Sequence, residues 1–336
     1  MSINVGIIGY GYWGPNLVRN FMETPGSQVI SVSDLQPELL RKVTTRYPTV
    51  KTTLDYRELI SDPSVDAVLV ATPVSVHYEL AMAALKAGKH VLVEKPLTSN
   101  SEQALRLIDE AERRKRVLMV DHTFVYTGAI QKIYELINNG ALGELYYYDS
   151  VRVNLGIFQQ DVSVIWDLAV HDLSIMEYII SPKPVAVSAT GISHVQGQPE
   201  NIAYMTLYFN SNMIAHIHVN WLAPVKVRRT LIGGSQKMIV YDDLDPSEKV
   251  KVYDKGISLT NGMENIYKLL ISYRTGDMWS PRLDTTEALR VEASEFLHCI
   301  DANKRPITDG TAGWRVVRLL EAASQSMSCR GCPVEL

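Results

Sequence analysis

A glycine-spaced turn near the start of the chain constrains the fold more than any other feature. The apolar run at residues 5–8 breaks into Gly9-Tyr10-Gly11-Tyr12-Trp13-Gly14 and then into a helical pattern. This G-x-G-x-x-G spacing is typical of a strand, a tight turn and a helix start. The first glycine allows the turn, the second lets a pyrophosphate approach, and the third lets the helix pack on the strand. The stretch therefore predicts a dinucleotide site, with phosphates held by the N–H groups of the helix start.

An acid at the expected distance strengthens this interpretation. A second apolar run, residues 28–33, ends on Asp34, twenty residues beyond Gly14, where the motif places a carboxylate for a ribose hydroxyl. The alternative is a structural turn followed by a surface aspartate. The order of strand, turn, helix, strand and acid favours the dinucleotide interpretation, with NAD preferred because no positive charge follows Asp34 directly.

Length and composition limit the class of protein. The chain has 336 residues, enough for two domains, with 46% hydrophobic and 21% charged residues and a net charge of -4. These values argue against nucleic acid and acidic membranes as partners. We find no secretory leader and no apolar run near the roughly 18 residues that cross a bilayer, so we expect a cytoplasmic protein. The odd number of cysteines, Cys299, Cys329 and Cys332, predicts no disulfide framework.

The order of apolar and amphipathic segments predicts an N-terminal Rossmann domain over residues 1–122. Strands are expected at 3–9, 28–34, 67–71, 90–94 and 117–120, and a helix at 76–86 ends before Gly88. Residues 123–336 are expected to form a second α/β domain with a large, mostly antiparallel open sheet. Its strands are expected at 144–154, 185–193, 202–209, 213–221, 226–232, 237–241 and 249–253, and its helices at 128–138, 166–180, 287–302 and 312–327.

Several polar residues follow the strands of the first domain. Thr72 and Pro73 come after one strand, and Glu94, Lys95 and Pro96 end the next, at the sheet edge where α/β proteins bind ligands. A lysine at that edge can polarise a substrate oxygen and take part in proton transfer. A solvated surface charge is the alternative.

In the second domain, Asp167 and His171 are four residues apart in a helical stretch and share one face. A carboxylate beside a histidine orients it as a proton carrier, although an ordinary i,i+4 pair or a helix cap is the alternative. Asp172 is another possible partner on a different helix face. His216 and His218 alternate along a strand without a third ligand, so we expect no metal site.

Together, the glycine turn, Ala71-Thr72-Pro73 with His77, Glu94-Lys95-Pro96, and Asp167 with His171 resemble the Gfo/Idh/MocA oxidoreductases. The resemblance implies an NAD(P)-dependent enzyme that oxidises or reduces a hydroxyl carbon of a sugar or cyclitol. It also implies that Lys95 is the catalytic lysine, that a cis bond precedes Pro96, and that Asp167 and His171 complete the catalytic group. Because family members often use the open sheet for oligomer contacts, we expect a homo-oligomer, dimer or tetramer, through the C-terminal sheet.

The Gly-Tyr-Trp-Gly-Pro-Asn opening and the stretch 166–172 look most like a subgroup that acts on nucleotide-linked sugars in surface-polysaccharide pathways. We therefore expect a nucleotide sugar that reacts at C3, with Arg274 and Arg282 as candidate diphosphate contacts in an irregular segment around Trp279. The alternatives are a free cyclitol or sugar dehydrogenase, an NAD-using glycoside hydrolase, which would produce no net NADH, and a non-catalytic dinucleotide sensor.

These inferences define two sets of site residues. The expected cofactor contacts are Gly9, Gly11, Tyr12, Trp13, Gly14, Asp34, Thr72, Pro73, His77, Glu94, Lys95 and Pro96. The expected substrate contacts are Lys95, Tyr126, Arg152, Asn154, Asp167, His171 and Arg282.

Overall fold

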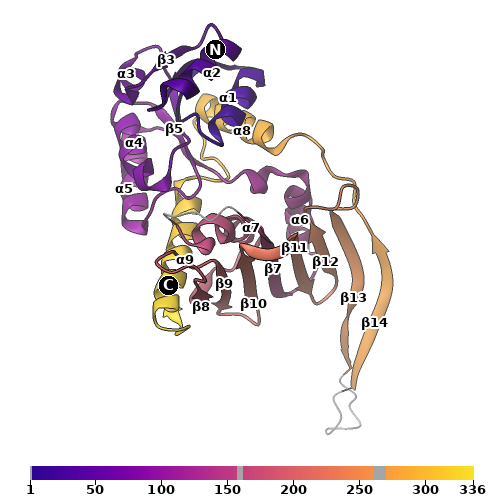
Figure 1. Ribbon diagram of the computed structural model, residues 1–336. Coiled ribbons are helices and arrows are strands. Elements are labelled where there is room, and N and C mark those ends of the chain that lie inside the picture. The colour runs from indigo at the N-terminus through magenta and orange to yellow at the C-terminus, as the bar shows by residue number, and fades with distance from the viewer. Residues whose placement is uncertain (1, 157–161, 261–269) are drawn as a thin grey trace. The chain divides into compact units, whose positions relative to one another are not determined.

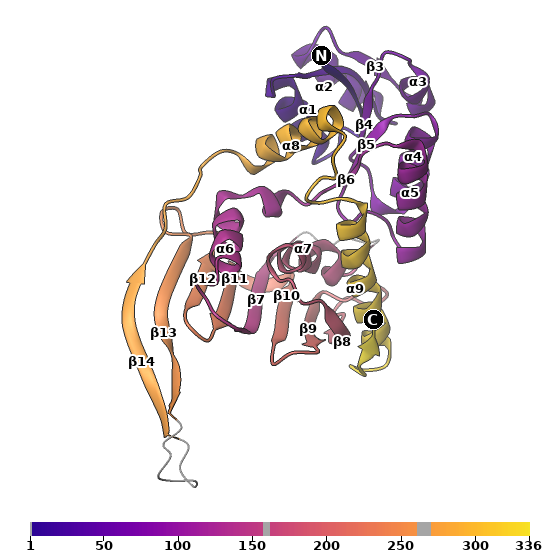
Figure 2. The same ribbon diagram turned by 180° about the vertical axis from the view of Figure 1, so that it is seen from behind.

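The computed structural model describes residues 2–156, 162–260 and 270–336, which form two compact units (Figures 1 and 2). Unit 1 comprises Met1–Thr127 and Thr286–Arg318, and unit 2 comprises Gly128–Thr285 and Leu319–Leu336. This division differs from the single cut after residue 122 that we expected. Helix α8 (Ala288–Ala302) returns to unit 1, where Phe296 packs edge-on against Phe21 of α1 (Gly14–Glu23) with ring centroids 6.2 Å apart.

Unit 1 contains a parallel sheet of six strands in the order β3-β2-β1-β4-β5-β6. This is the strand order of a dinucleotide-binding fold, in which the order reverses between β1 and β4. Strand β4 is buried at every position, as expected of a parallel sheet that is covered on both faces. The strands are β1 (Ile3–Ile8), β2 (Ser27–Ser33), β3 (Lys51–Thr53), β4 (Ala67–Val70), β5 (His90–Glu94) and β6 (Leu118–Asp121).

The helices of unit 1 follow local signals in the sequence. Helix α4 (Val74–Lys86) ends before Gly88, whose φ of 78° only glycine adopts without strain. Helix α5 (Ser101–Arg114) begins after Asn100, whose side chain accepts a hydrogen bond from the Gln103 N–H. Strand β3 and three helices were not predicted from the sequence. These helices are α2 (Pro37–Arg46), α3 (Tyr56–Ser61) and α5, and a short 3₁₀ helix, η1 (Thr123–Tyr126), follows β6.

Unit 2 contains a sheet of nine strands in the order β14-β13-β12-β11-β7-β10-β9-β8-β15, in which only β10 and β7 pair in parallel. The prediction of a mostly antiparallel sheet is confirmed. The strands are β7 (Leu145–Leu155), β8 (Pro184–Ile192), β9 (Ile202–Phe209), β10 (Ile214–Asn220), β11 (Leu222–Gly234), β12 (Met238–Asp242), β13 (Val250–Thr260), β14 (Leu270–Trp279) and β15 (Val334–Glu335).

One face of this sheet is buried and the other is open. Along β9, Met205 and Leu207 are buried, whereas Tyr204 before them and Tyr208 after them are exposed. The buried face packs against helices, since the Tyr148 hydroxyl of β7 donates to the Asp172 carbonyl of α7. Figure 1 shows α6 and α7 beside the strands of this sheet. Four helical segments lie wholly or partly in the described part of unit 2. They are α6 (Gly128–Asn138), the π-helical turn η2 (Ile165–Ala169), α7 (Val170–Ile179) and α9 (Gly310–Ser328), which begins in unit 1.

Two expectations about the C-terminal half are wrong. Arg274 does not lie in an irregular segment but on β14, where it forms an ion pair with Asp254 of β13 at 3.0 Å. Cys329 and Cys332 are joined by a disulfide, although the odd cysteine count argued against one. The turn between the two cysteines places their Cα atoms 5.7 Å apart, because Arg330 and Gly331 adopt left-handed backbone angles.

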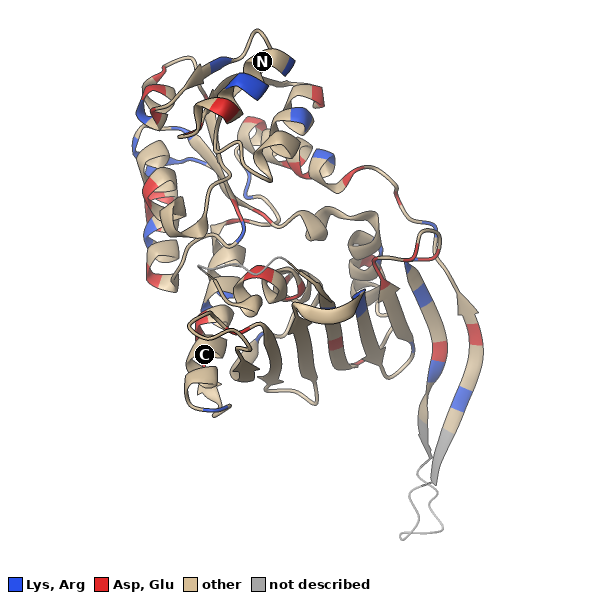
Figure 3. Cartoon of the chain, viewed as in Figure 1, with Lys and Arg blue, Asp and Glu red and all other residues tan. Residues whose placement is uncertain are grey.

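Charged residues of both signs are interspersed along the chain, for example on β13 and β14 in Figure 3. Among the described residues, no helix combines the length and the apolar character that a bilayer crossing requires.

Candidate active site

The three glycines of the turn have the separate roles that the motif predicts. Gly9 has a φ of 98°, and a Cβ there would collide with the Ala71 carbonyl at the end of β4. A Cβ on Gly14 would collide with the Gly9 carbonyl, so the third glycine lets α1 approach the turn. By contrast, nothing lies within 4 Å of a Cβ on Gly11. The backbone at Gly11 is therefore open on the side where a pyrophosphate would approach, and the loop fits a bound dinucleotide.

Asp34 lies at the carboxyl end of β2, where a ribose acceptor is needed. Its Oδ2 accepts the Tyr10 N–H at 2.7 Å and its Oδ1 accepts the Gln36 N–H at 2.8 Å. These two bonds hold the carboxylate beside the glycine turn, while the side chain remains partly exposed. One carboxylate oxygen has a second lone pair direction available for a hydroxyl, and the negative charge would repel a 2′-phosphate.

The loops after β4 and β5 meet at the same sheet edge, and His77 joins them. Its Nδ1 lies 2.9 Å from the Pro96 carbonyl and its Nε2 lies 2.7 Å from the Thr72 carbonyl. The side chain is fully buried, and burial lowers its pKa despite the two carbonyls. His77 therefore braces the two loops from within, which corrects our expectation that it contacts the cofactor. The Lys95–Pro96 bond is cis, as the resemblance implied.

Lys95 is half-buried at this edge, directly after Glu94 ends β5. The ends of β5 and β6 are paired, since Glu94 aligns with Asp121. His122 follows Asp121 and is buried, and burial together with the nearby Lys95 charge lowers its pKa to about 3. Lys95 thus lies near the neutral His122 and at the strand end where Glu94 and Asp121 are paired. Of these neighbours, the sequence had singled out Glu94 but not Asp121 or His122.

Trp13, in the glycine turn, reaches the end of β6. Its indole Nε1–H donates to Asp121 Oδ2 at 2.6 Å, and the Thr123 hydroxyl donates to Oδ1 at 2.5 Å. Asp121 is 2% exposed. Glu292 of α8 is fully buried and lies against Asp121. Burial raises the pKa of Glu292, and the negative charge of Asp121 raises it further. This acidic cluster belongs to unit 1 and was missed from the sequence.

In unit 2, Asp167 lies within the five-residue π-helical turn η2 and His171 lies in the first turn of α7. The helical prediction for this stretch holds, but its first turn is wider than an α-helical one. π-turns inside helices are frequent at functional sites. The Asp167 Oδ2 atom accepts a hydrogen bond from the Trp221 indole at 3.2 Å. Trp221 is 1% exposed, so a rigid aromatic side chain orients this carboxylate.

Arg152 does not fit the substrate contact that we expected. It is 4% exposed, and its guanidinium donates to both Asp172 oxygens, at 2.7 Å to Oδ2 and 3.2 Å to Oδ1. The Asp172 Oδ1 atom also accepts the Ser150 hydroxyl at 2.8 Å. Arg152 and Asp172 therefore form a buried ion pair inside unit 2, which also removes Asp172 as a partner for His171.

Tyr126 is a second correction. It is 2% exposed, and its hydroxyl lies 3.0 Å from the Thr308 hydroxyl, inside unit 1. Burial raises its pKa well above the usual value, and the nearby Glu292 adds to this shift. A side chain enclosed in this way packs the unit and does not reach a substrate. Asn154 is half-buried near the end of β7, and Arg282 is exposed in the irregular segment 280–286, so both remain candidates.

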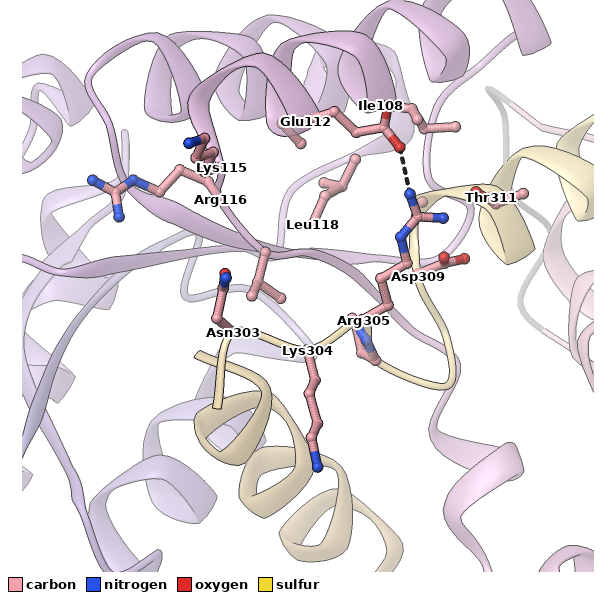
Figure 4. Close-up of a pocket in the computed structure, with 14 residues that line it drawn as sticks. Ile108, Glu112, Lys115, Arg116, Leu118, Asn303, Lys304, Arg305, Asp309 and Thr311 are labelled. Carbon is pink, nitrogen blue, oxygen red and sulfur yellow. Dashed lines mark hydrogen bonds and ion pairs between the residues drawn. The ribbon is translucent and has the colours of Figure 1, made fainter. Parts of the chain in front are cut away.

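A separate pocket in unit 1 lies away from this edge. It is lined by residues of α5, the start of β6 and the segment between α8 and α9, including Leu118 and Arg305 (Figure 4). Leu118 begins β6, whereas Asp121 ends it, so the pocket lies at the amino edge of the sheet. Lys115, Arg116 and Lys304 point in different directions in Figure 4, and Arg305 is bonded to Glu112. The cations do not converge on a common ligand.

No group of three or more histidine, cysteine, aspartate or glutamate side chains suited to a metal occurs in the described part of the chain. The residues that sequence reasoning missed are Asp121, Glu292 and Trp221. One signal was present for Asp121, because it lies at the carboxyl end of a strand, where Glu94 and, one residue past its strand, Asp34 also lie. Glu292 reaches Asp121, and Trp221 reaches Asp167, only through tertiary packing within their own units, for which a single sequence holds no local signal.

Comparison with known proteins agrees with this architecture. The family model described as "Oxidoreductase family, NAD-binding Rossmann fold" matches residues 3–122, and the "GFO/IDH/MocA C-terminal domain" matches residues 130–240. The chain is 32% identical over 266 residues to the uncharacterized oxidoreductase YdgJ of Escherichia coli, covering 74% of this chain and 73% of that protein.

Two relatives with named activities match over nearly their whole length. UDP-N-acetylglucosamine 3-dehydrogenase of Acidithiobacillus ferrooxidans is 28% identical, covering 94% of this chain and 95% of that one. Its crystal structure superposes with a TM-score of 0.80 over 98% of this chain and 99% of that chain, at 26% identity. Myo-inositol 2-dehydrogenase of Thermotoga maritima is 26% identical, covering 97% of this chain and 96% of that one. The chain therefore belongs to the Gfo/Idh/MocA family and is an NAD-dependent sugar oxidoreductase that acts on a CH–OH group.

Proposed function

We propose that the substrate is a nucleotide-linked sugar that is oxidised or reduced at C3, in surface-polysaccharide or related sugar biosynthesis. The observation that carries this proposal is the full-length similarity to a UDP-N-acetylglucosamine 3-dehydrogenase, in sequence and in fold. The exposed Arg282 and the half-buried Asn154 are the polar groups of unit 2 that we assign to the nucleotide or sugar. A free cyclitol is the second candidate, because an inositol dehydrogenase is almost equally similar.

We further propose that Lys95, Asp167 and His171 act on one substrate. NAD supplies the hydride acceptor or donor. The Lys95 ammonium donates a hydrogen bond to the reacting oxygen and stabilises the charge that develops there. His171 accepts the hydroxyl proton during oxidation and returns it during reduction. Asp167, held by the Trp221 indole, orients His171 in this scheme. The role of Asp167 is therefore one of positioning.

Titration calorimetry of the NAD-loaded protein tests the substrate class. We expect binding of UDP-, dTDP- or GDP-linked sugars and much weaker binding of free inositol or glucose, because a diphosphate adds charged hydrogen bonds that a cyclitol lacks. Tight binding of inositol with none of any nucleotide sugar would reject the first candidate in favour of the second. An Arg282→Ala variant serves as the internal check, since it should weaken nucleotide-sugar binding and leave inositol binding unchanged.

We also propose that a second copy of the chain covers the open face of the unit 2 sheet, as a dimer or as part of a tetramer. Tyr204, Tyr208 and Ile214 on adjacent strands β9 and β10 are 45%, 39% and 47% exposed on this face. An apolar patch of this kind marks an interaction site in soluble proteins. Light scattering after size exclusion should give at least a dimer, and Ile214→Arg should shift the protein toward monomer. A monomeric wild-type protein at micromolar concentration would exclude the proposal.

A further inference from the structure

The acidic cluster of unit 1 contains two adjacent buried carboxyl groups with unequal hydrogen bonding. Asp121 accepts one hydrogen bond on each oxygen, from the Trp13 indole at 2.6 Å and from the Thr123 hydroxyl at 2.5 Å. Both oxygens of Glu292 are buried without a hydrogen-bond partner. Burial and Asp121 raise the pKa of Glu292, and the Thr123 hydroxyl lies close enough to offset these larger effects slightly. Thr123 has one hydroxyl hydrogen, which it gives to Asp121.

Two carboxylates in contact inside a protein do not both carry a charge, because each raises the energy of the other. The charge remains on Asp121, since two donors stabilise it there. Glu292 retains its proton and becomes a donor, with Asp121 as its acceptor. A protonated Glu292 also needs no outside donor for its buried oxygens, because its carboxyl group supplies a hydrogen of its own. The raised pKa of Glu292, caused by burial and then by Asp121, agrees with it.

The bond from Trp13 to Asp121 joins distant parts of the cofactor edge. Trp13 belongs to the turn after β1, whereas Asp121 ends β6, and β4 and β5 lie between these two strands in the sheet. Thr72 and Lys95 follow these intervening strands. The Trp13–Asp121 hydrogen bond therefore lies along the edge on which the nicotinamide half of a dinucleotide is expected. A group that holds Asp121 in place also holds the glycine turn in place, through Trp13.

We propose that Glu292 is a positioning residue for NAD: as a neutral acid it donates a hydrogen bond to Asp121, which in turn holds Trp13 and the glycine turn in the binding conformation. Helix α8 delivers Glu292 to this point although it lies more than 150 residues away from Asp121 in sequence. The proposal concerns cofactor binding alone and is independent of which sugar the enzyme uses.

Other titratable groups also face the cluster. They are Glu94 and Lys95 after β5, His122 after β6, Tyr126 of η1, and Glu295 on the same helix as Glu292. His122 is neutral above pH values near its pKa of about 3, and it does not change charge in the alkaline range. Ionisation of Glu292 at high pH would place a second negative charge against Asp121 and Glu94 and would weaken the Trp13 contact.

Calorimetric titration of the whole protein with NAD, without substrate, tests the proposal. Glu292→Leu removes the donor, and we expect roughly ten- to hundredfold weaker NAD binding, the range for a disrupted buried hydrogen bond. Glu292→Gln replaces the acid hydroxyl with an amide N–H donor and should retain most of the affinity. Trp13→Phe should weaken binding to a similar extent, and adding Glu292→Leu to it should cause little further loss. Asp301→Leu on the exposed side of α8 is the matched control.

The pH profile separates this role from general packing. Wild-type affinity for NAD should fall as pH rises and Glu292 ionises, whereas the Glu292→Gln profile should lack this fall. Identical profiles for the two proteins would overturn the proposal, as would equal losses in Glu292→Gln and Glu292→Leu. If Glu292→Leu does not fold, Trp13→Phe and the two pH profiles decide the matter, and unchanged NAD binding by Trp13→Phe would overturn the proposal as well.

Discussion

Units 1 and 2 contribute functional groups in different ways. In unit 1, Asp34 follows a parallel strand, and Glu94 and Asp121 each end one, so one sheet edge gathers them together with the glycine turn. In unit 2, Asp167 lies on a π-helical turn and depends on Trp221, which follows strand β10. The carboxyl ends of parallel strands always share one edge of a sheet, so this topology brings the unit 1 residues together. The contact between Asp167 and Trp221 in unit 2 depends instead on how that unit packs. Substitutions in unit 1 should therefore affect the cofactor first, and those in unit 2 the substrate.

The largest expected effect concerns the core of unit 2. Arg152→Leu leaves Asp172 charged and buried without its main partner, and we expect a loss of about 3–5 kcal/mol in the free energy of unfolding. Urea unfolding followed by tryptophan fluorescence measures it. Arg274→Leu is the matched control, because its ion pair is partly exposed and worth less than about 1 kcal/mol. Equal losses of unfolding free energy in both variants would show that the buried ion pair contributes no more to stability than the partly exposed one.

The next prediction tests whether both units act on one substrate. Lys95→Ala in unit 1 and His171→Ala in unit 2 should each lower kcat roughly a hundredfold or more, the scale of a lost positioned acid or base. NAD affinity should survive in His171→Ala. Steady-state kinetics and NAD titration measure the two effects separately. Lys86→Ala and His298→Ala, at exposed helical positions, should leave turnover unchanged. Near wild-type turnover in either active-site variant would remove that residue from the catalytic group.

Lowering the pH should destabilise unit 1 more than unit 2. In unit 1, burial lowers the pKa of His90 to about 4 and that of His122 to about 3. Because the unfolded chain has pKa values near 6.5, it binds more protons, and stability is lost as pH falls from about 6.5 toward these folded values. For the fully buried His122 the loss reaches about 2 kcal/mol or more near pH 4.5.

Hydrogen exchange resolved by peptide would follow this acid effect. Peptides of unit 1 should lose protection at a higher pH than those of unit 2. In the described part of unit 2, burial lowers the pKa of His218, which is only half-buried. A His90→Asn variant should reduce the difference, because it removes one of the histidines that must be protonated on unfolding. Simultaneous loss of protection in both units would contradict the prediction.

A smaller effect is expected at Asp167. Trp221→Phe keeps an aromatic ring in the core but removes the indole donor, and we expect kcat to fall about tenfold while NAD affinity is unchanged. Trp166→Phe is the matched control, because its indole donates to the Ser324 hydroxyl and not to an acid. If the two variants have equal kcat, the Trp221 contact does not position the Asp167 carboxylate for turnover.

The smallest expected effect concerns cofactor choice. The Asp34 carboxylate should favour NAD over NADP in kcat/KM, and Asp34→Ser should shift this ratio toward NADP by roughly tenfold, because it removes the charge that repels a 2′-phosphate. Glu38→Gln removes a nearby exposed charge and serves as the control. Arg41 is the first cation after Asp34 in the sequence. Equal use of NAD and NADP by the wild type would contradict the assignment of Asp34.

The sequence predicted most of unit 1 because its signals are local. The glycine turn, the acid at Asp34 and the step from Glu94 to Pro96 each combine a strand end with a defined residue type. Helix α5 was missed because its largely polar surface pattern carries a weaker apolar signal than the buried strands. In unit 2, the alternation of apolar residues predicted most strands, but β14 and the two-residue β15 were missed. Arg152 and Tyr126 were assigned to the substrate because residue type and order in the chain do not reveal burial.

The return of α8 to unit 1 has a consequence for synthesis of the chain. Residues 128–285 separate the two segments of this unit, a gap of 158 residues. At about 5–20 residues per second, translation of that gap takes roughly ten to thirty seconds. During this time the nascent glycine-turn segment lacks Phe296 against Phe21 and Glu292 against Asp121. The cofactor unit is encoded first but completed nearly last, and a gene fragment that stops near codon 127 would encode an incomplete core.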